Sequence, residues 1–284
     1  MSRRGESDGR AGSPRGVILD LDGTVYLGEN ALPGAVEAIA ALRAYGLPVV
    51  FVTNKPLEPA AAYAAKLTRL GIPTGSDDVI TSSRVLGDYF ARQAPRARVF
   101  VIGEPPLQEE MRRVGLQLTE EPAEIEYVVA ALDRTFDYRK WNIAFRALKF
   151  HDARLVATNG DRTCPVPGGE IPDCAGIIAA LETSSGRQVE LIAGKPSPQM
   201  IRAAAARLKV RPEQCMVVGD RLETDIVMGR AAGARTALVL TGVSTRAEAR
   251  RQPKPPDLIL NNLGELAERL IENQPPGTRR AERM

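Results

Sequence analysis

The chain has 284 residues, which is enough for two domains of ordinary size. Its 38 Lys and Arg and 35 Asp and Glu residues leave a net charge of +3, too small to attract nucleic acid or an anionic membrane surface. Three cysteines and a single histidine, without CxxC or CxxH spacing, argue against a disulfide framework and a zinc site.

The chain also lacks the patterns that would place it in or across a membrane. No apolar run approaches the ~20 residues that a membrane-spanning helix needs, and the N-terminus lacks the apolar segment of a signal peptide. We therefore expect a soluble, cytoplasmic protein. The two ends, residues 1–15 and 273–284, have few apolar residues and are expected to be mobile.

The first part of the chain alternates short β-branched runs with alanine-rich segments. Strands are predicted over 16–21 and 48–53, and helices over 35–45 and 59–70, each helix being closed by a glycine. Such alternation is typical of βαβ units around a parallel sheet.

The middle of the chain repeats this alternation with elements of its own. Strands are predicted over 99–102, 127–131 and 155–157, and helices over 139–150 and 175–184. The last part returns to the pattern, with strands over 190–193, 215–218, 236–240 and 258–260 and helices over 197–208 and 225–232.

The predicted fold is therefore α/β, with a doubly wound parallel sheet as its core. Residues 16–84 and 188–272 form this core domain, and residues 85–187 form an inserted α/β domain. The placement of the insertion depends on chemistry, because the candidate catalytic residues all fall before or after it.

Polar residues follow four of the predicted core strands. Asp20 and Asp22 end the first strand in the run DLDGT, and Thr53 and Asn54 end the second. The remaining polar residues are Lys195 in GKPSP and Asp220 and Asp225 in GDRLETD. Because ligands gather at the carboxyl ends of parallel strands, we expect these side chains to meet in one crevice.

Four carboxylates in one crevice call for a cation. Asp20 and Asp22 alone lie about 6 to 7 Å apart on the same side of a strand end, and like charges that close repel. The available ligands are all oxygens, so a hard ion is expected, and Mg²⁺ characteristically binds one or two carboxylates and a substrate phosphate oxygen.

With a metal present, the other residues fit phosphoryl transfer. A carboxylate is a nucleophile that needs no activating base. Lys195 and Thr53 can neutralise and position a phosphoryl group, and Asp22 is the candidate that protonates the leaving oxygen and later takes a proton from water.

These four motifs, in this order, resemble those of the haloacid dehalogenase superfamily. The large insertion and the runs TNGDRTCPVPGG, AALETSSGR and LTGVST resemble its type IIA branch, the NagD-like phosphatases. The resemblance implies a Rossmann-like core with a C2-type cap and a magnesium-dependent phosphatase of small phosphorylated metabolites such as phosphoglycolate, glycerol phosphate, pyridoxal phosphate, sugar phosphates or nucleoside monophosphates. It allows a homodimer formed through the cap.

The resemblance also implies roles for individual residues. Asp20 would be the nucleophile and Asp22 the acid/base and a backbone metal ligand. Asp20 and Asp220 would bind the metal with their side chains. Thr53, Asn54 and Lys195 would bind the phosphoryl group, and Asp225 would orient the lysine or metal-bound water.

The second motif departs from the family at Lys55, where the branch commonly has a second asparagine. Lys55 adds a cation near the entrance and is a candidate specificity residue. In the cap, Asn159, Asp161 and Arg162 either reach the substrate or shape a loop rich in proline and glycine.

Other functions have weaker support in the sequence. A phosphomutase retains Asp22 and stays an alternative, as does a non-catalytic protein that binds a phosphorylated metabolite. A receiver domain lacks the insertion, and a dehalogenase would not need Asp22. The substrate itself depends on cap loops whose geometry the sequence does not determine.

Overall fold

The computed structural model describes residues 13–166 and 168–272, so most of the two polar ends lies outside the described residues. Its largest sheet is parallel and has the strand order β15-β14-β13-β1-β4-β5. The strands are β1 (Gly16–Asp20), β4 (Val49–Thr53), β5 (Val79–Thr81), β13 (Cys215–Gly219), β14 (Arg235–Val239) and β15 (Leu258–Leu260). The predicted doubly wound core is confirmed, and β5 is an additional strand.

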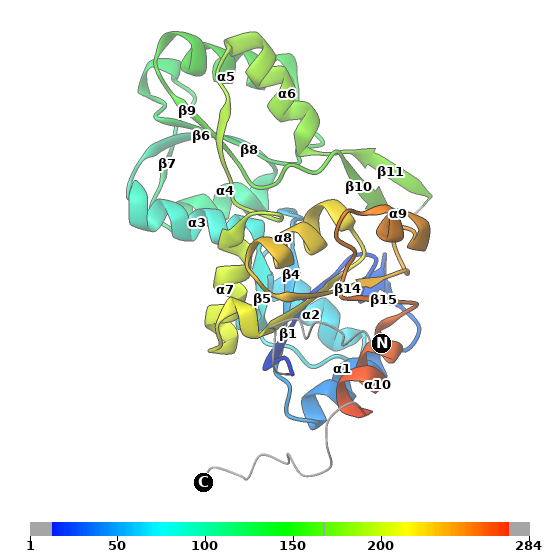
Figure 1. Ribbon diagram of the computed structural model, residues 1–284. Coiled ribbons are helices and arrows are strands. Elements are labelled where there is room, and N and C mark those ends of the chain that lie inside the picture. The colour runs from blue at the N-terminus through cyan, green and yellow to red at the C-terminus, as the bar shows by residue number, and fades with distance from the viewer. Residues whose placement is uncertain (1–12, 167, 273–284) are drawn as a thin grey trace.

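Helices cover both faces of this sheet (Figure 1). One face carries α1 (Ala35–Ala44), α2 (Ala60–Arg69) and α10 (Leu263–Glu272), and the other carries α7 (Pro198–Leu208) and α8 (Val227–Ala231). Side chains alternate along each strand, so Val17 and Leu19 pack on the first set of helices and Ile18 packs on the second. Burial on both faces explains why the strands are continuous apolar runs.

The inserted segment forms a second parallel sheet, which stands above the first in Figure 1. Its strands, in the order β12-β9-β8-β6-β7, are β6 (Arg98–Ile102), β7 (Gln117–Leu118), β8 (Tyr127–Ala130), β9 (Arg154–Ala157) and β12 (Val189–Ile192). Helices α3 (Ser82–Gln93) and α4 (Pro105–Arg113) lie on one face and α5 (Tyr138–Phe150) and α6 (Cys174–Ser185) on the other.

The second domain differs from the predicted bounds of 85–187 at both ends, since α3 already begins at Ser82. The expected insertion ends at residue 187, but β12 lies beyond it and pairs with β9 in the second sheet. The apolar pair Leu191 and Ile192 would suit an edge strand of either sheet, and only the pairing partner decides between them. The chain returns to the core at Ala193–Lys195, directly after this strand.

The described residues also form two short antiparallel hairpins. Strands β10 (Thr163–Val166) and β11 (Gly169–Pro172) pair antiparallel within the segment that the sequence suggested as a loop. Strands β2 (Tyr26–Leu27) and β3 (Asn30–Ala31) form the other hairpin, and α9 (Arg246–Arg251) follows β14. None of the helices in the described part of the chain has the length and apolar character needed to cross a bilayer.

Candidate active site

The core strands bring three acidic side chains to one edge of the sheet. Asp20 is the last residue of β1, and Asp220 directly follows the neighbouring strand β13. Asp225 lies in η4 (Leu222–Ile226), a short π-helix just beyond. All three are buried, and one carboxylate oxygen from each lies within 4.8 Å of the others. The structure therefore brings the acids of the first and last motifs together, as the sequence predicts.

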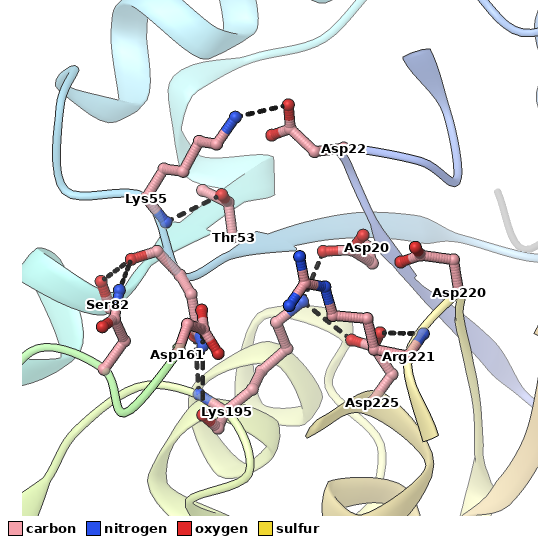
Figure 2. A network of polar contacts seen from close by, with 12 residues as sticks. Asp20, Asp22, Thr53, Lys55, Ser82, Asp161, Lys195, Asp220, Arg221 and Asp225 are labelled. Carbon is pink, nitrogen blue, oxygen red and sulfur yellow. Dashed lines mark hydrogen bonds and ion pairs between the residues drawn. The ribbon is translucent and has the colours of Figure 1, made fainter. Parts of the chain in front are cut away.

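Lys195 carries the ammonium group of this cluster. Its Nζ contacts both Asp20 Oδ1 and Asp225 Oδ1 (Figure 2), and the residue is only 4% exposed. The distance to Asp225 Oδ1 is 2.8 Å. Burial by itself would lower the pKa of Lys195, but the charges of Asp20 and Asp225 outweigh it and raise the pKa above its ordinary value. Lys195 is thus a fixed positive charge at neutral pH.

Three carboxylates and one ammonium leave this cluster short of positive charge. Burial, followed by the charges of Asp20 and Asp225, raises the pKa of Asp220. Its Oδ2 accepts a hydrogen bond from the Val243 N–H at 2.7 Å, whereas Oδ1 is buried without a hydrogen-bond partner. A Cβ at Gly242 would overlap Asp220, so glycine permits this close approach.

The cluster therefore fits a divalent metal ion. Its donors are all carboxylate oxygens, which suit a hard cation such as Mg²⁺, and an orphaned, buried oxygen on Asp220 is placed to bind one. The side chain of Asp22 is not part of this group of acids.

Asp22 points instead toward Lys55 (Figure 2). Lys55 Nζ lies 2.7 Å from Asp22 Oδ1 and 3.4 Å from the carbonyl oxygen of Pro165 in the second domain. Burial raises the pKa of Asp22, and the charge of Lys55 offsets this only in part. A carboxyl whose protonated form is favoured in this way is suited to donate a proton.

Thr53 and Asn54 connect this edge of the sheet to the second domain. Thr53 ends β4 and accepts a hydrogen bond from the Lys55 N–H at 3.2 Å. The amide of Asn54 accepts from the Lys195 N–H at 2.7 Å and donates to Asp161 Oδ2 at 2.9 Å. Asn54 therefore holds the lysine segment and a carboxylate of the second domain at the same time.

The three candidate residues of the second domain have different surroundings. Asn159 is fully buried and donates to the Asn54 carbonyl oxygen at 3.1 Å. Asp161 lines a pocket that also contains Asp20 and Lys195. Arg162 is exposed and is not among the pocket residues. The pocket is lined by Asp20, Asp22, Thr53, Asn54, Lys55, Asp161, Thr163, Cys164, Pro165, Asp173, Lys195, Arg221 and Thr224.

Several of these lining residues were not identified from the sequence. Arg221 faces the acidic cluster: burial opposes its charge, but Asp220 and the other carboxylates raise its pKa. Thr224 is buried, and its hydroxyl has no hydrogen-bond partner. Both lie between Asp220 and Asp225 in the GDRLETD run, so the polar residues between these two acids were a usable signal in the sequence. Asp173, which follows β11, carries no comparable motif.

Comparisons with known proteins agree with this geometry. Residues 17–117 match the family model of haloacid dehalogenase-like hydrolases, and residues 192–266 match a HAD-hydrolase-like model. The sugar-phosphatase AraL of Bacillus subtilis is 39% identical over 251 residues, which cover 88% of this chain and 91% of the relative. The chain belongs to the haloacid dehalogenase superfamily.

Solved structures place it in the type IIA branch of that superfamily. A p-nitrophenyl phosphatase from Archaeoglobus fulgidus superposes with a TM-score of 0.84 at 33% identity, covering 90% of this chain and 99% of that one. A glycerol phosphate phosphatase from Mycobacterium tuberculosis, solved in complex with magnesium, gives a TM-score of 0.82 at 35% identity and covers 90% and 77%. This haloacid dehalogenase-type protein is a phosphoric monoester hydrolase, and its inserted domain is the cap.

Proposed function

We propose that this chain is a magnesium-dependent phosphatase that hydrolyses small phosphate monoesters through a phospho-aspartate at Asp20. The observation that supports this most directly is the cluster in which Lys195 contacts Asp20 and Asp225 beside the orphaned oxygen of Asp220. Sugar-phosphatase, glycerol phosphate phosphatase and p-nitrophenyl phosphatase relatives agree with a small phosphorylated substrate.

The first half-reaction transfers the phosphoryl group to the protein. A carboxylate oxygen of Asp20 attacks phosphorus, the bond from phosphorus to the leaving oxygen breaks, and Asp22 gives its proton to that oxygen. Lys195, the Thr53 hydroxyl and the Asn54 N–H bind the phosphoryl oxygens and hold them in line.

The second half-reaction releases phosphate. Asp22, now a carboxylate, takes a proton from water while the water oxygen attacks phosphorus, and the bond to Asp20 breaks. The cap excludes other water from the pocket and selects the leaving group. When bound by Asp20, Asp220 and the backbone carbonyl of Asp22, Mg²⁺ would supply positive charge to the phosphate oxygens.

Magnesium should also stabilise the folded protein. Because the ion binds the native cluster and not the unfolded chain, we expect millimolar MgCl₂ to raise the Tm above its value in EDTA, in parallel with phosphate release from p-nitrophenyl phosphate. Asp220→Asn should lose most of this rise and most of the activity, while keeping its Tm in EDTA because a buried charge is removed. An equal magnesium shift in the wild type and Asp220→Asn would contradict the assignment.

Lys55 is proposed to position Asp22 through the 2.7 Å ion pair. Replacing it in Lys55→Met should lower kcat by about tenfold with little change in KM, because the acid/base loses its orientation while the phosphate site is kept. Steady-state kinetics with p-nitrophenyl phosphate would measure both constants. A change confined to KM would instead place the Lys55 ammonium on the substrate.

Release of inorganic phosphate without a bisphosphate activator would separate this function from that of a phosphomutase. The homodimer through the cap that the family resemblance allows stays a prediction, which light scattering on the purified chain would test.

A further inference from the structure

The part of the catalytic pocket built by the cap is acidic and hydroxylated. Asp161 follows β9, Thr163 begins β10, and Asp173 lies between β11 and α6, yet all three line the pocket that contains Asp20. Two carboxyl groups on the leaving-group side are unexpected in a site that binds anionic phosphate. Phosphate binding does not explain these two carboxyl groups, so we ask what else they could bind.

Asp161, Thr163 and Asp173 form the side of the pocket that we call the leaving-group wall. Asp173 is buried in this wall. It is 4% exposed, its Oδ1 accepts a hydrogen bond from the Cys174 N–H at 2.6 Å, which caps α6, and the side chain of the buried Asn159 also interacts with its carboxylate. Burial raises its pKa to about 6, with a further contribution from the charge of Asp161. Asparagine caps helices as well as aspartate does, so capping alone does not require a charge here.

Asp161 brings a second carboxylate to the same wall. Its Oδ2 accepts the Asn54 amide at 2.9 Å, which ties the cap to the loop after β4. Arg221 of the core also lines the pocket and balances part of the charge of Asp161 and Asp173. The wall therefore offers carboxylate acceptors, together with the hydroxyl of Thr163 as a donor or acceptor.

This chemistry discriminates among leaving groups. A carboxylate or a second phosphate on the leaving group would face Asp161 and Asp173 and be repelled. The two cations that also line the pocket are already engaged, Lys55 by Asp22 and Arg221 by the carboxylates around it. No aromatic side chain is found among the pocket residues of the described chain, so a pyridine ring or a nucleobase has no stacking surface. Hydroxyl groups, by contrast, donate to carboxylates in strong charge-assisted hydrogen bonds.

We infer that the substrate is the phosphate ester of a neutral polyhydroxylated compound, a sugar or polyol, whose hydroxyls donate to Asp161 and Asp173. The inference rests on the proposed phosphatase function and narrows its substrate class. Asp161 and Asp173 are then specificity-determining residues that contact the leaving group, while the phosphate end is bound by Lys195 and Thr53.

Kinetics on the purified full-length protein with Mg²⁺ would test the inference. We expect kcat/KM for glycerol phosphate or for pentose and hexose phosphates to exceed that for phosphoglycolate and pyridoxal phosphate by at least tenfold. Asp173→Asn and Asp161→Asn should each lower kcat/KM for the hydroxylated esters by about 10- to 100-fold relative to p-nitrophenyl phosphate, because a hydrogen bond to a charged group is lost.

Asp137→Asn is the matched control for Asp173→Asn. Asp137 caps the cap helix α5 through the Lys140 N–H, as Asp173 caps α6, but it is exposed and is not among the pocket residues. The same substitution there should leave the ratio of kcat/KM between hydroxylated esters and p-nitrophenyl phosphate as it is in the wild type.

A stability measurement separates a substrate contact from a structural role. The pKa of Asp173 is raised in the folded state, so its ionisation lowers stability as pH rises from about 4 through about 6. Asp173→Asn should therefore have a higher Tm than the wild type at pH 7.5, with a smaller gain at pH 5. A residue needed for the fold would instead lose Tm on substitution.

The possible outcomes are distinct. Preference for phosphoglycolate or pyridoxal phosphate would overturn the inference, as would equal losses on all esters in the two variants. Preference for phosphoethanolamine, removed by the same variants, would replace the polyol by a cationic leaving group. If the wild type hydrolyses none of the esters, the proposed function itself fails, and the inference about its substrate fails with it.

Discussion

Asp20→Asn is expected to abolish phosphate release from p-nitrophenyl phosphate, with a loss of more than about 10³-fold in kcat. An amide cannot attack phosphorus to form the covalent intermediate, and Asp22, the other acid of the DLDGT run, points toward Lys55 and cannot take its place. Detection of inorganic phosphate at saturating substrate and Mg²⁺ would measure the loss. Incubation with substrate followed by acid quench should trap phosphate on the wild-type protein only.

The folded state should survive this substitution. Asparagine has nearly the same size as aspartate, and removing one of three crowded carboxylates relieves repulsion with Asp220 and Asp225. Asp152→Asn is a suitable control, since the Asp152 side chain is 92% exposed and pairs with Arg187 in the cap. Unchanged turnover in Asp20→Asn would refute a phospho-aspartate at this position.

The cluster of Asp20, Asp220 and Lys195 was predictable because it depends mainly on the order of the strands and much less on the conformation of individual loops. A buried parallel strand that ends in polar residues presents them at one edge of the sheet. Once β1 and β13 are recognised as neighbouring strands, Asp20 and Asp220 must lie close together. Lys195 was expected in the same place, although the strand that precedes it, β12, belongs to the cap sheet.

The leaving-group wall was not predictable in the same way. Asp173 reaches the pocket because the hairpin β10–β11 folds back and the cap packs on the core. A local sequence pattern predicts neither of these arrangements. The cap residues singled out from the sequence show the limit: Asp161 lines the pocket, whereas its neighbour Arg162 is exposed. The direction of a side chain in an irregular segment depends on long-range packing.

Asn54 shows how the two domains share one site. Its side chain binds the backbone of Lys195 and the carboxylate of Asp161, and its carbonyl oxygen accepts from Ser82 at 2.7 Å and from Asn159. Ser82 begins α3, where the chain leaves the core, and Lys195 is where it returns. The loop after β4 is therefore hydrogen-bonded to both connections between the domains through one residue.

Lys195→Met is expected to lower both activity and stability. Loss of the ammonium should reduce kcat by more than about 10³-fold, because it is the positive charge that pairs with both Asp20 and Asp225. It also leaves two buried carboxylates without their counter-charge, a change that typically destabilises a fold by about 3 to 5 kcal/mol. Urea unfolding at pH 8 in EDTA would measure this loss.

The pH dependence of that loss identifies its cause. Burial already raises the pKa of Asp225 to about 6, and removing Lys195 takes away the interaction that lowers it. A carboxyl whose pKa is raised by folding contributes stability at low pH that disappears as pH rises, so the deficit of Lys195→Met should shrink between pH 8 and pH 5. The double variant Lys195→Met, Asp225→Asn should recover part of the stability at pH 8 without recovering activity, and Lys149→Met, an exposed lysine of α5, is the control. A deficit that is the same at both pH values would show that lost packing, and not unpaired charge, destabilises the variant.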